Sequence, residues 1–194
     1  MMDARVKPAH DKGTDATIAH LDDDQSDKTQ MPRRQRQDEK GEWIMIEWFE
    51  DLSLGMRFKS EKVQISEDDI KQFAAKFDPQ PFHLDDEAAR ETIFKGLAAS
   101  GWHTAAIAMS LCVKARPFGP HPLIGLGVDG LRWMLPVRPD DILHIEGEVV
   151  SLTRSRTKPQ GTALVKWTLY NQKGEAVYTF TPIALVPCRP ERMA

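Results

Sequence analysis

A carboxylate and an imidazole lie five residues apart in the segment 77–85, which also holds two prolines. The two side chains are Asp78 and His83, and the prolines are Pro79 and Pro81. Each proline fixes its own φ and biases the preceding residue away from helix, so we expect a short, stiff loop that aims both side chains at one point. Because histidine titrates near neutral pH, it can both accept and donate a proton there. The pair is therefore a candidate for general acid–base catalysis.

A second candidate lies downstream, where Gly101 stands at the expected start of an apolar helix. The first N–H groups of a helix have no partner within it, and the helix dipole places partial positive charge there. Glycine has no Cβ, so a ligand carbonyl can approach its backbone closely and its oxygen can be stabilised as it gains charge. The alternative is that Gly101 only allows tight packing of helix on sheet. With Asp78 and His83 upstream, we favour the oxyanion role.

Together the two segments resemble the hydratase signature of the MaoC-like dehydratase family, the (R)-specific enoyl-CoA hydratases. In that family an Asp-x-x-Pro-x-His motif precedes a glycine at the head of a long central helix. Asp78, Pro81 and His83 match the motif, Gly101 matches the glycine, and the resemblance extends over residues 49–190. It implies the hot-dog fold, in which an antiparallel sheet wraps a long central helix. It also implies a hydro-lyase that reversibly hydrates an enoyl thioester.

This chain departs from the family pattern at two places. Family members often have His-Gly where this chain has Ser100-Gly101. Some place a serine in the central helix near the acidic residue, where this chain has Met109. These departures concern the substrate and the tuning of Asp78, and they leave the Asp78/His83 pair intact.

The resemblance implies catalytic roles for Asp78, His83 and Gly101. The expected substrate-binding residues are their neighbours Pro81, Phe82, Ser100 and Trp102. The expected substrate is an acyl-CoA or acyl-carrier thioester. We expect no cofactor and no metal, because the sequence shows no cluster with metal-ligand spacing, no G-x-S-x-G elbow and no nucleotide-binding glycine loop.

Three further features have a functional and a structural explanation, and we favour the structural one for each. His103 could line the pocket, but we expect a core histidine with satisfied hydrogen bonds. Arg132 and Trp133 indicate an arginine paired across strands beside a buried indole. The basic run 154–158 could meet the phosphates of coenzyme A, but a solvated loop is the better interpretation.

Two other functions use the same fold, because a fold does not determine a function. A thioesterase usually has a carboxylate on the central helix to activate water, and residues 101–115 contain no Asp or Glu. The second alternative is a non-catalytic subunit that binds acyl thioesters. Such a subunit would not need acid–base residues, so the presence of Asp78, His83 and Gly101 argues against it.

The apolar pattern predicts the helices that position these residues. Ser66, with Asp69 at the capping-box position, predicts a helix that ends at Asp78. A short helical turn is expected at 86–91. Residues 101–115 are apolar nearly all round, which predicts a buried helix.

The same pattern predicts an antiparallel sheet and hence an α+β domain. Residues 56–65 read as a strand, and alternating apolar and polar residues after Leu123 predict further strands. Residues 172–175 form a turn between two of them. An unpaired strand edge in each protomer predicts a homodimer.

Composition sets the remaining expectations. The 194 residues carry a net charge of −3 and suit one domain with a real core, at 43–194, with no nucleic acid or membrane partner. Residues 1–42 have few large apolar side chains, which predicts a disordered tail. Met45 is a candidate initiator just after it.

Cys112 and Cys188 form no metal spacing and no disulfide framework, which fits a cytoplasmic protein. We expect Cys112 to be a buried thiol.

Overall fold

The computed structural model describes residues 36–37, 43–44 and 46–190, which fall within one compact unit, Arg33–Ala194. The helices are α1 (Glu67–Phe77), α2 (Pro81–Leu84), α3 (Asp86–Arg90) and α4 (Gly101–Ala115), with a 3₁₀ turn at Phe49–Asp51. The strands are β1 (Arg36–Gln37), β2 (Trp43–Ile44), β3 (Arg57–Lys59), β4 (Val63–Gln64), β5 (Ile124–Trp133), β6 (Ile142–Arg154), β7 (Gln160–Tyr170) and β8 (Ala176–Pro187).

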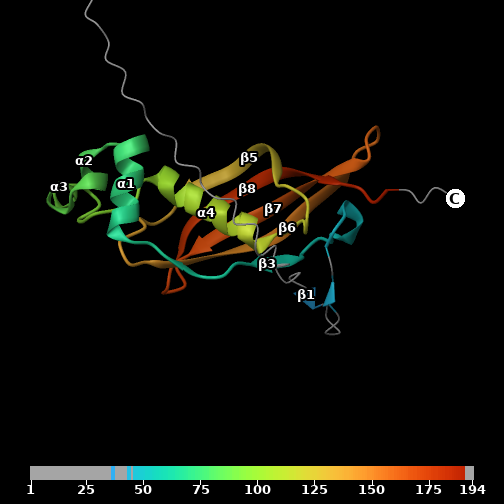
Figure 1. The fold of residues 1–194 in the computed structure, drawn as a ribbon, viewed down its shortest axis with the longest axis horizontal. Helices are drawn as coiled ribbons and strands as arrows, with labels where there is room; N and C mark the ends of the chain where they lie inside the picture. The colour runs from blue at the N-terminus through green and yellow to red at the C-terminus, as the bar shows by residue number, and fades with distance from the viewer. Residues whose placement is uncertain (1–35, 38–42, 45, 191–194) are drawn as a thin grey trace, which may run out of the picture. The chain divides into compact units, whose positions relative to one another are not determined.

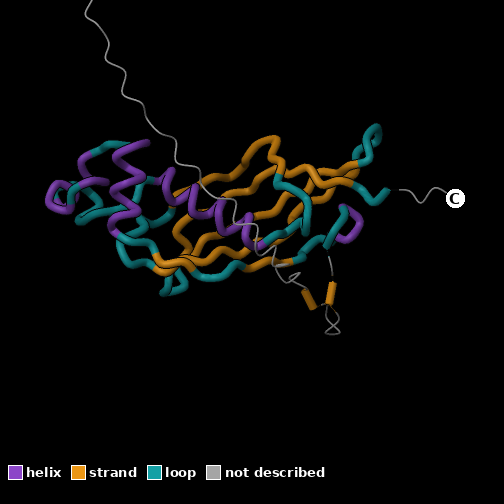
Figure 2. Tube along the Cα trace, in the orientation of Figure 1, coloured by secondary structure: helices purple, strands orange, loops and turns teal. Residues whose placement is uncertain are grey.

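A six-stranded antiparallel sheet and the helix α4 make up the body of the fold (Figure 1). The strand order is β3-β6-β7-β8-β5, with β4 also paired to β6. Figure 2 shows α4 running across the sheet, while α1, α2 and α3 gather at one end, beside the start of α4. This arrangement agrees with the predicted α+β class and brings the two candidate segments to the same end of the sheet.

The core lies between α4 and the inner face of the sheet. Alternate residues of the long strands are buried there, as the period of a strand requires. They include Leu143, Ile145, Val165, Leu169 and Val177, each at most 1% exposed. The helix contributes Ala108, Leu111 and Cys112. Cys112 is the buried thiol that we predicted, and burial raises its pKa.

The helix predictions are largely confirmed. In α1 the Ser66 hydroxyl accepts a hydrogen bond from the Asp69 amide at 3.1 Å, and the Asp69 carboxylate accepts one from the Ser66 amide at 3.1 Å. This is the predicted capping box, and α1 ends at Phe77, before Asp78 and the first proline. The helix α4 has the predicted bounds and buries one face in the core, as predicted for an apolar helix, but its other face is exposed at Trp102, Met109 and Val113.

Two local predictions need correction. Residues 56–65 form two strands. Three residues lie between Lys59 and Val63, but only two lie between their partners Glu146 and Leu143 on β6, and the extra residue interrupts the pairing, as in a bulge. The expected loop after Asp78 also contains a helix, α2. Its first residue is Pro81, whose fixed φ suits the first helical position.

Most of the predicted N-terminal tail lies outside the described residues. Residues 1–35 and 38–42 of the predicted tail are not described; Arg36–Gln37 pairs with Trp43–Ile44 in a two-stranded sheet. The domain boundary at 42/43 therefore stays a prediction. Among the described helices, none is long and apolar enough to cross a membrane.

Candidate active site

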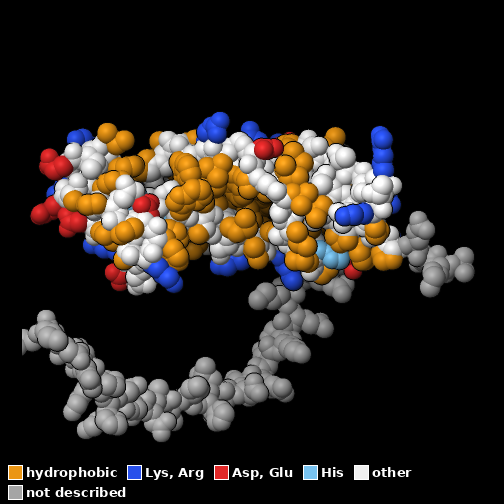
Figure 3. Space-filling view, turned by 90° about the horizontal axis from the view of Figure 1, so that it is seen from above, with side chains coloured by type: hydrophobic (Ala, Val, Ile, Leu, Met, Phe, Trp, Pro, Cys, Tyr) orange, Lys and Arg blue, Asp and Glu red, His pale blue; other side chains and the backbone are white. Residues whose placement is uncertain are grey.

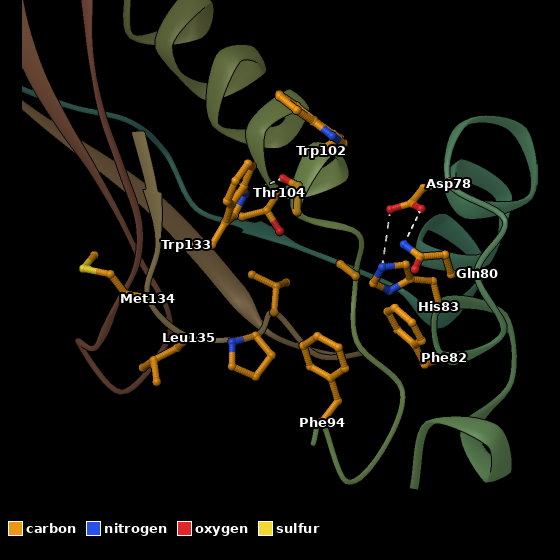
Figure 4. Close-up of a pocket in the computed structure, with 14 residues that line it drawn as sticks. Asp78, Gln80, Phe82, His83, Phe94, Trp102, Thr104, Trp133, Met134 and Leu135 are labelled. Carbon is orange, nitrogen blue, oxygen red and sulfur yellow. Dashed lines mark hydrogen bonds and ion pairs between the residues drawn. The ribbon is translucent and has the colours of Figure 1, made fainter. Parts of the chain in front are cut away.

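Asp78 and His83 meet where α1 and α2 come together. Asp78 is the C-cap residue that directly follows α1, and His83 lies on α2. The Nε2 atom of His83 lies 3.4 Å from Oδ2 of Asp78, which is longer than a normal hydrogen bond. Figure 4 shows the two side chains pointing toward each other. The proximity of the pair, expected from the sequence, is therefore present, although His83 lies on a helix and is only 4% exposed.

The carboxylate of Asp78 is held by two further side chains. The Ser100 hydroxyl donates to Oδ2 at 2.7 Å, and the Gln80 amide donates to Oδ1 at 2.7 Å. The pKa of Asp78 is lowered, chiefly by the hydrogen bond from Ser100, against the opposing effect of burial; Gln80 and His83 add to the lowering. Asp78 is thus an oriented carboxylate that stays ionised near neutral pH.

The histidine ring is fixed from its other side. Its Nδ1 atom lies 2.7 Å from the carbonyl oxygen of Ala98. A carbonyl only accepts hydrogen bonds, so Nδ1 carries the proton and Nε2 of the neutral ring has a free lone pair. In the neutral ring that lone pair lies next to the carboxylate of Asp78, so the two groups can act as acceptors toward one molecule that lies beside both of them in the pocket.

Gly101 lies at the start of α4, as predicted, and it contacts an aromatic ring. The indole Nε1 of Trp133 donates to the carbonyl oxygen of Gly101 at 2.7 Å. A Cβ on residue 101 would lie 2.8 Å from two atoms of this ring. The amide of Gly101 is the first of the helix and has no acceptor within it. Ser100 caps the same helix by accepting a hydrogen bond from the Trp102 amide at 3.2 Å.

A pocket of about 450 Å³ opens beside the pair. In Figure 4, Asp78, Gln80 and His83 lie on one side of it, and Trp133, Met134 and Leu135 lie on the other. The lining residues are Asp78, Gln80, Phe82, His83, Phe94, Ala99, Gly101, Trp102, Thr104, Trp133, Met134, Leu135, Pro136 and Val137. The walls are mostly apolar, with polar groups concentrated at the Asp78/His83 side, which is typical of small-molecule sites.

The expected site residues divide into two groups. Asp78, His83, Gly101, Phe82 and Trp102 line the pocket. Pro81 and Ser100 do not line it. Pro81 begins α2, and Ser100 is fully buried behind Asp78, where it joins that carboxylate to the start of α4.

The prediction that the Trp133 indole is buried is wrong. The indole is 46% exposed and lines the pocket instead of being buried. The guanidinium of Arg132 is exposed and donates to the carbonyl oxygen of Leu131, not to a neighbouring strand. No local signal marks Trp133, because its contact with Gly101 joins residues 32 positions apart.

His103 is buried as expected, but its hydrogen bonds are not all satisfied. Its ring stacks on Phe73 with centroids 4.7 Å apart, between α4 and α1. Its Nδ1 atom has no hydrogen-bond partner among the described residues. Burial lowers the pKa of His103, and the charge of Asp69 opposes that effect. His103 is not among the pocket-lining residues.

Neither the basic run nor a metal cluster belongs to this pocket. Residues 154–158 include the turn between β6 and β7, at the end of the sheet away from α1, α2 and α3 (Figure 1). Within the described part of the chain, no group of three or more His, Cys, Asp or Glu side chains could hold a metal ion.

Comparison with known proteins shows the family of this chain. A family model described as the MaoC like domain matches residues 51–171, more than half of the chain. The chain belongs to the MaoC-like domain family. The uncharacterized protein YdeM of Bacillus subtilis (strain 168) is 34% identical over 129 residues, which cover 66% of this MaoC-like chain and 91% of YdeM.

Solved structures show the same relationship for this MaoC-like protein. A MaoC-like dehydratase from Rhodospirillum rubrum is 44% identical, with a TM-score of 0.70 over 74% of this chain and 99% of that one. The R-hydratase PhaJ1 from Pseudomonas aeruginosa is 28% identical, with a TM-score of 0.57 over 73% and 86% of the two chains. The fold is the hot-dog fold, which confirms the prediction.

Proposed function

We propose that this protein is a hydro-lyase that reversibly adds water to the α,β-double bond of an enoyl thioester, carried on coenzyme A or an acyl carrier. The observation that carries the proposal is the Asp78/His83 pair, whose facing atoms lie 3.4 Å apart beside an apolar pocket. Membership of the MaoC-like family supports hydratase chemistry in general. The particular substrate and the roles of these residues are our inference.

In the proposed reaction, one water molecule lies in the pocket beside Asp78 and His83 and contacts both side chains. The carboxylate and the Nε2 lone pair both accept hydrogens from it, which orients an oxygen lone pair toward Cβ of the substrate. As the oxygen adds to Cβ, one member of the pair takes a proton from the water, and the pair then delivers that proton to Cα, so that it ends in its starting protonation state. The product is a 3-hydroxyacyl thioester, and no group is lost or oxidised.

The thioester carbonyl is proposed to bind at the amide of Gly101. Charge develops on this oxygen as Cβ is attacked, and the positive end of α4 stabilises it. Losing one such donor typically costs about 10²–10³-fold in rate. The apolar walls formed by Phe82, Phe94 and Trp133 would hold the acyl group next to the pair.

A thioesterase is the alternative on this fold, and the site favours hydration instead. The helix α4 carries no Asp or Glu to activate water for attack on the thioester carbonyl. The carboxylate and the imidazole that line the pocket belong to Asp78 and His83, which lie outside α4. A non-catalytic acyl-thioester-binding subunit is the second alternative, and an inactive wild type that binds thioesters would support it.

We also propose a homodimer built on the exposed apolar surface of β5 and α4. This patch, named the β5/α4 patch, comprises Trp102, Met109, Val113, Ile124, Leu126, Val128 and Trp133, all of them exposed. Figure 3 shows hydrophobic side chains gathered along the middle of the face seen from above. Among the described strands, β5 ends the sheet and pairs only with β8, so within this part of the chain its other edge has no strand beside it. A second copy of the chain would cover both the patch and the edge of β5.

A cytoplasmic location stays a prediction from the cysteine content.

The test is direct assay against a panel of enoyl-, 3-hydroxyacyl- and saturated acyl-CoA thioesters. Hydration is followed by loss of the ultraviolet absorbance of the conjugated enoyl group, and hydrolysis by release of free thiol. We expect hydration of at least one enoyl thioester. Hydrolysis of an acyl-CoA without any hydration would replace the proposal with the thioesterase.

A further inference from the structure

We propose that Asp86 and Arg138 are positioning residues for the acid–base pair. Together they fix the backbone segment 94–98, so that the carbonyl of Ala98 keeps the proton of the neutral His83 ring on Nδ1. This inference rests on the proposed hydratase function for its effect on rate. Its effect on the histidine ring can be measured without any substrate.

Arg138 binds the segment through its guanidinium. Its Nη1 atom donates to the carbonyl oxygens of Gly96 at 2.5 Å and Leu97 at 2.9 Å, and its Nη2 atom donates to that of Phe94. One guanidinium thus binds three carbonyl groups within four residues. Its own backbone is held because its amide donates to the Asp141 carboxylate at 2.7 Å.

Asp86 binds the same segment through its carboxylate. Its Oδ1 atom accepts a hydrogen bond from the Leu97 amide at 2.8 Å, and this bond is the main cause of its lowered pKa. Gly96 passes between the two charged groups with φ +147°, and a Cβ there would lie 3.5 Å from Oδ1 of Asp86 and 3.6 Å from Nη1 of Arg138. Those distances are ordinary van der Waals contacts, so glycine is favoured here by its φ, which side chains of L residues rarely adopt.

These contacts leave Ala98 little freedom. Both the amide and the carbonyl of Leu97 are bound, and the Ala99 amide donates to the carbonyl oxygen of Val137 at 2.9 Å. The peptide groups on either side of Ala98 are therefore fixed to neighbouring elements. The segment belongs to no helix or strand. The side chains of Asp86 and Arg138 therefore supply hydrogen bonds that a helix or a sheet would supply from its own backbone. The carbonyl of Ala98 is left aimed at Nδ1 of His83.

The guanidinium of Arg138 does not serve the pocket directly. Arg138 is absent from the residues that line the pocket, and its donors point at backbone oxygens. It therefore acts through Ala98 and His83, and its loss should change the protonation of the ring before it changes substrate binding. If Nδ1 loses its acceptor, the proton can move to Nε2, and Nε2 then no longer accepts a hydrogen from water.

The experiment compares Arg138→Met, which keeps the aliphatic stem, and Arg138→Lys with Arg57→Met. Arg57 pairs with Glu148 on the sheet surface and serves as the matched arginine control. Nitrogen NMR of ¹⁵N-histidine protein reports the tautomer of His83. We expect the Nδ1–H form in wild type and Arg57→Met, and a mixture of tautomers in both Arg138 variants. The kcat should fall by about tenfold or more, but by less than the ~10²–10⁴-fold due to an acid–base group itself, with little change in KM.

A second pair of variants keeps the test decisive if Arg138 variants fail to fold. Asp86→Leu removes the acceptor for Leu97 and should mix the tautomers, while Asp86→Asn retains an acceptor oxygen and should not. Arg90→Met removes only the ion pair that Arg90 makes with Asp86, and should behave as wild type.

Two results would overturn the inference. One is an Nδ1–H tautomer and wild-type kcat in folded Arg138→Met or Asp86→Leu protein. The other is a raised KM with the tautomer unchanged, which would make Arg138 a substrate anchor. If the tautomer changes as expected but wild type hydrates no enoyl thioester, the positioning role stands and the proposed function fails.

Discussion

The indole ring of Trp133 lies against Gly101, so that a Cβ on residue 101 would come within 2.8 Å of the ring. The ring is held there by its hydrogen bond to the carbonyl oxygen of Gly101, at 2.7 Å. The sequence offered two reasons for this glycine, approach of a ligand carbonyl and close packing. The structure provides a packing partner, which is a side chain of the pocket wall, and the amide of Gly101 remains the proposed oxyanion donor.

Gly101→Ala should destabilise the protein by about 1–3 kcal/mol, the usual cost of overpacking. The new Cβ must displace the Trp133 ring, and the fall in kcat should accompany a lower melting temperature. In a Trp133→Leu background the same change should cost much less stability, because the ring is gone. Thermal unfolding and kcat of the four proteins in this cycle are the measurements. An undiminished stability cost in the Trp133→Leu background would contradict the packing explanation.

Asp78→Asn and His83→Gln should each lower hydration by about 10²–10⁴-fold, because each removes one group that handles the protons of water. The double variant should be little worse than either single, since both act on one water molecule. Glutamine is preferred to alanine at residue 83, because the ring is buried and alanine would leave a cavity. Loss of enoyl absorbance measures the rate, with circular dichroism as the folding control. A folded Asp78→Asn protein of near wild-type rate would remove Asp78 from the mechanism.

Ser100→Ala should shift the acid limb of the pH profile of kcat/KM to higher pH. The hydrogen bond from Ser100 is the main cause of the lowered pKa of Asp78, so the pKa rises without it. The stability due to this lowered pKa is present above the pKa of the unfolded chain and is lost as pH falls through the folded value. In Ser100→Ala that part of the stability is reduced. The measurements are kcat/KM and unfolding free energy as functions of pH.

Ser66→Ala is the matched control for Ser100→Ala. Both serines cap a helix, and both hold down the pKa of a nearby aspartate, Asp78 for Ser100 and Asp69 for Ser66. Each change should cost about 1 kcal/mol through loss of the cap. Asp69 does not line the pocket, so the acid limb of activity should stay in place in Ser66→Ala. If the acid limb of kcat/KM shifts equally in both variants, it does not reflect the titration of Asp78.

Leu126→Lys should weaken the proposed homodimer, because it places a charge in the middle of the β5/α4 patch. Light scattering at micromolar concentration should show a dimer for wild type and a larger monomer fraction for the variant. Ile93→Lys is the control, since Ile93 is an exposed apolar residue outside the patch. A monomeric wild type would contradict the dimer, and an equal effect of both changes would place the interface elsewhere.

Local patterns in the sequence were sufficient for the elements that carry the site. The Ser66 cap, the prolines after Asp78 and the apolar run from Gly101 each act within a few residues of chain. Capping, fixed φ and helical period are decided at that range. The start and end of α1 and of α4 could therefore be predicted, and with them the ends that Asp78 and Gly101 occupy.

The contacts that orient the side chains depend on tertiary structure. Ser100 reaches Asp78 across 22 positions, Trp133 reaches Gly101 across 32, and Arg138 reaches Phe94 across 44. No pattern of neighbouring residues encodes such pairs, because they form only when the sheet and α4 bring distant segments together. The sequence by itself thus determined which groups could do acid–base chemistry. The packing of α1, α2 and the segment 94–98 around the start of α4 decided their protonation, their orientation and the walls of the pocket.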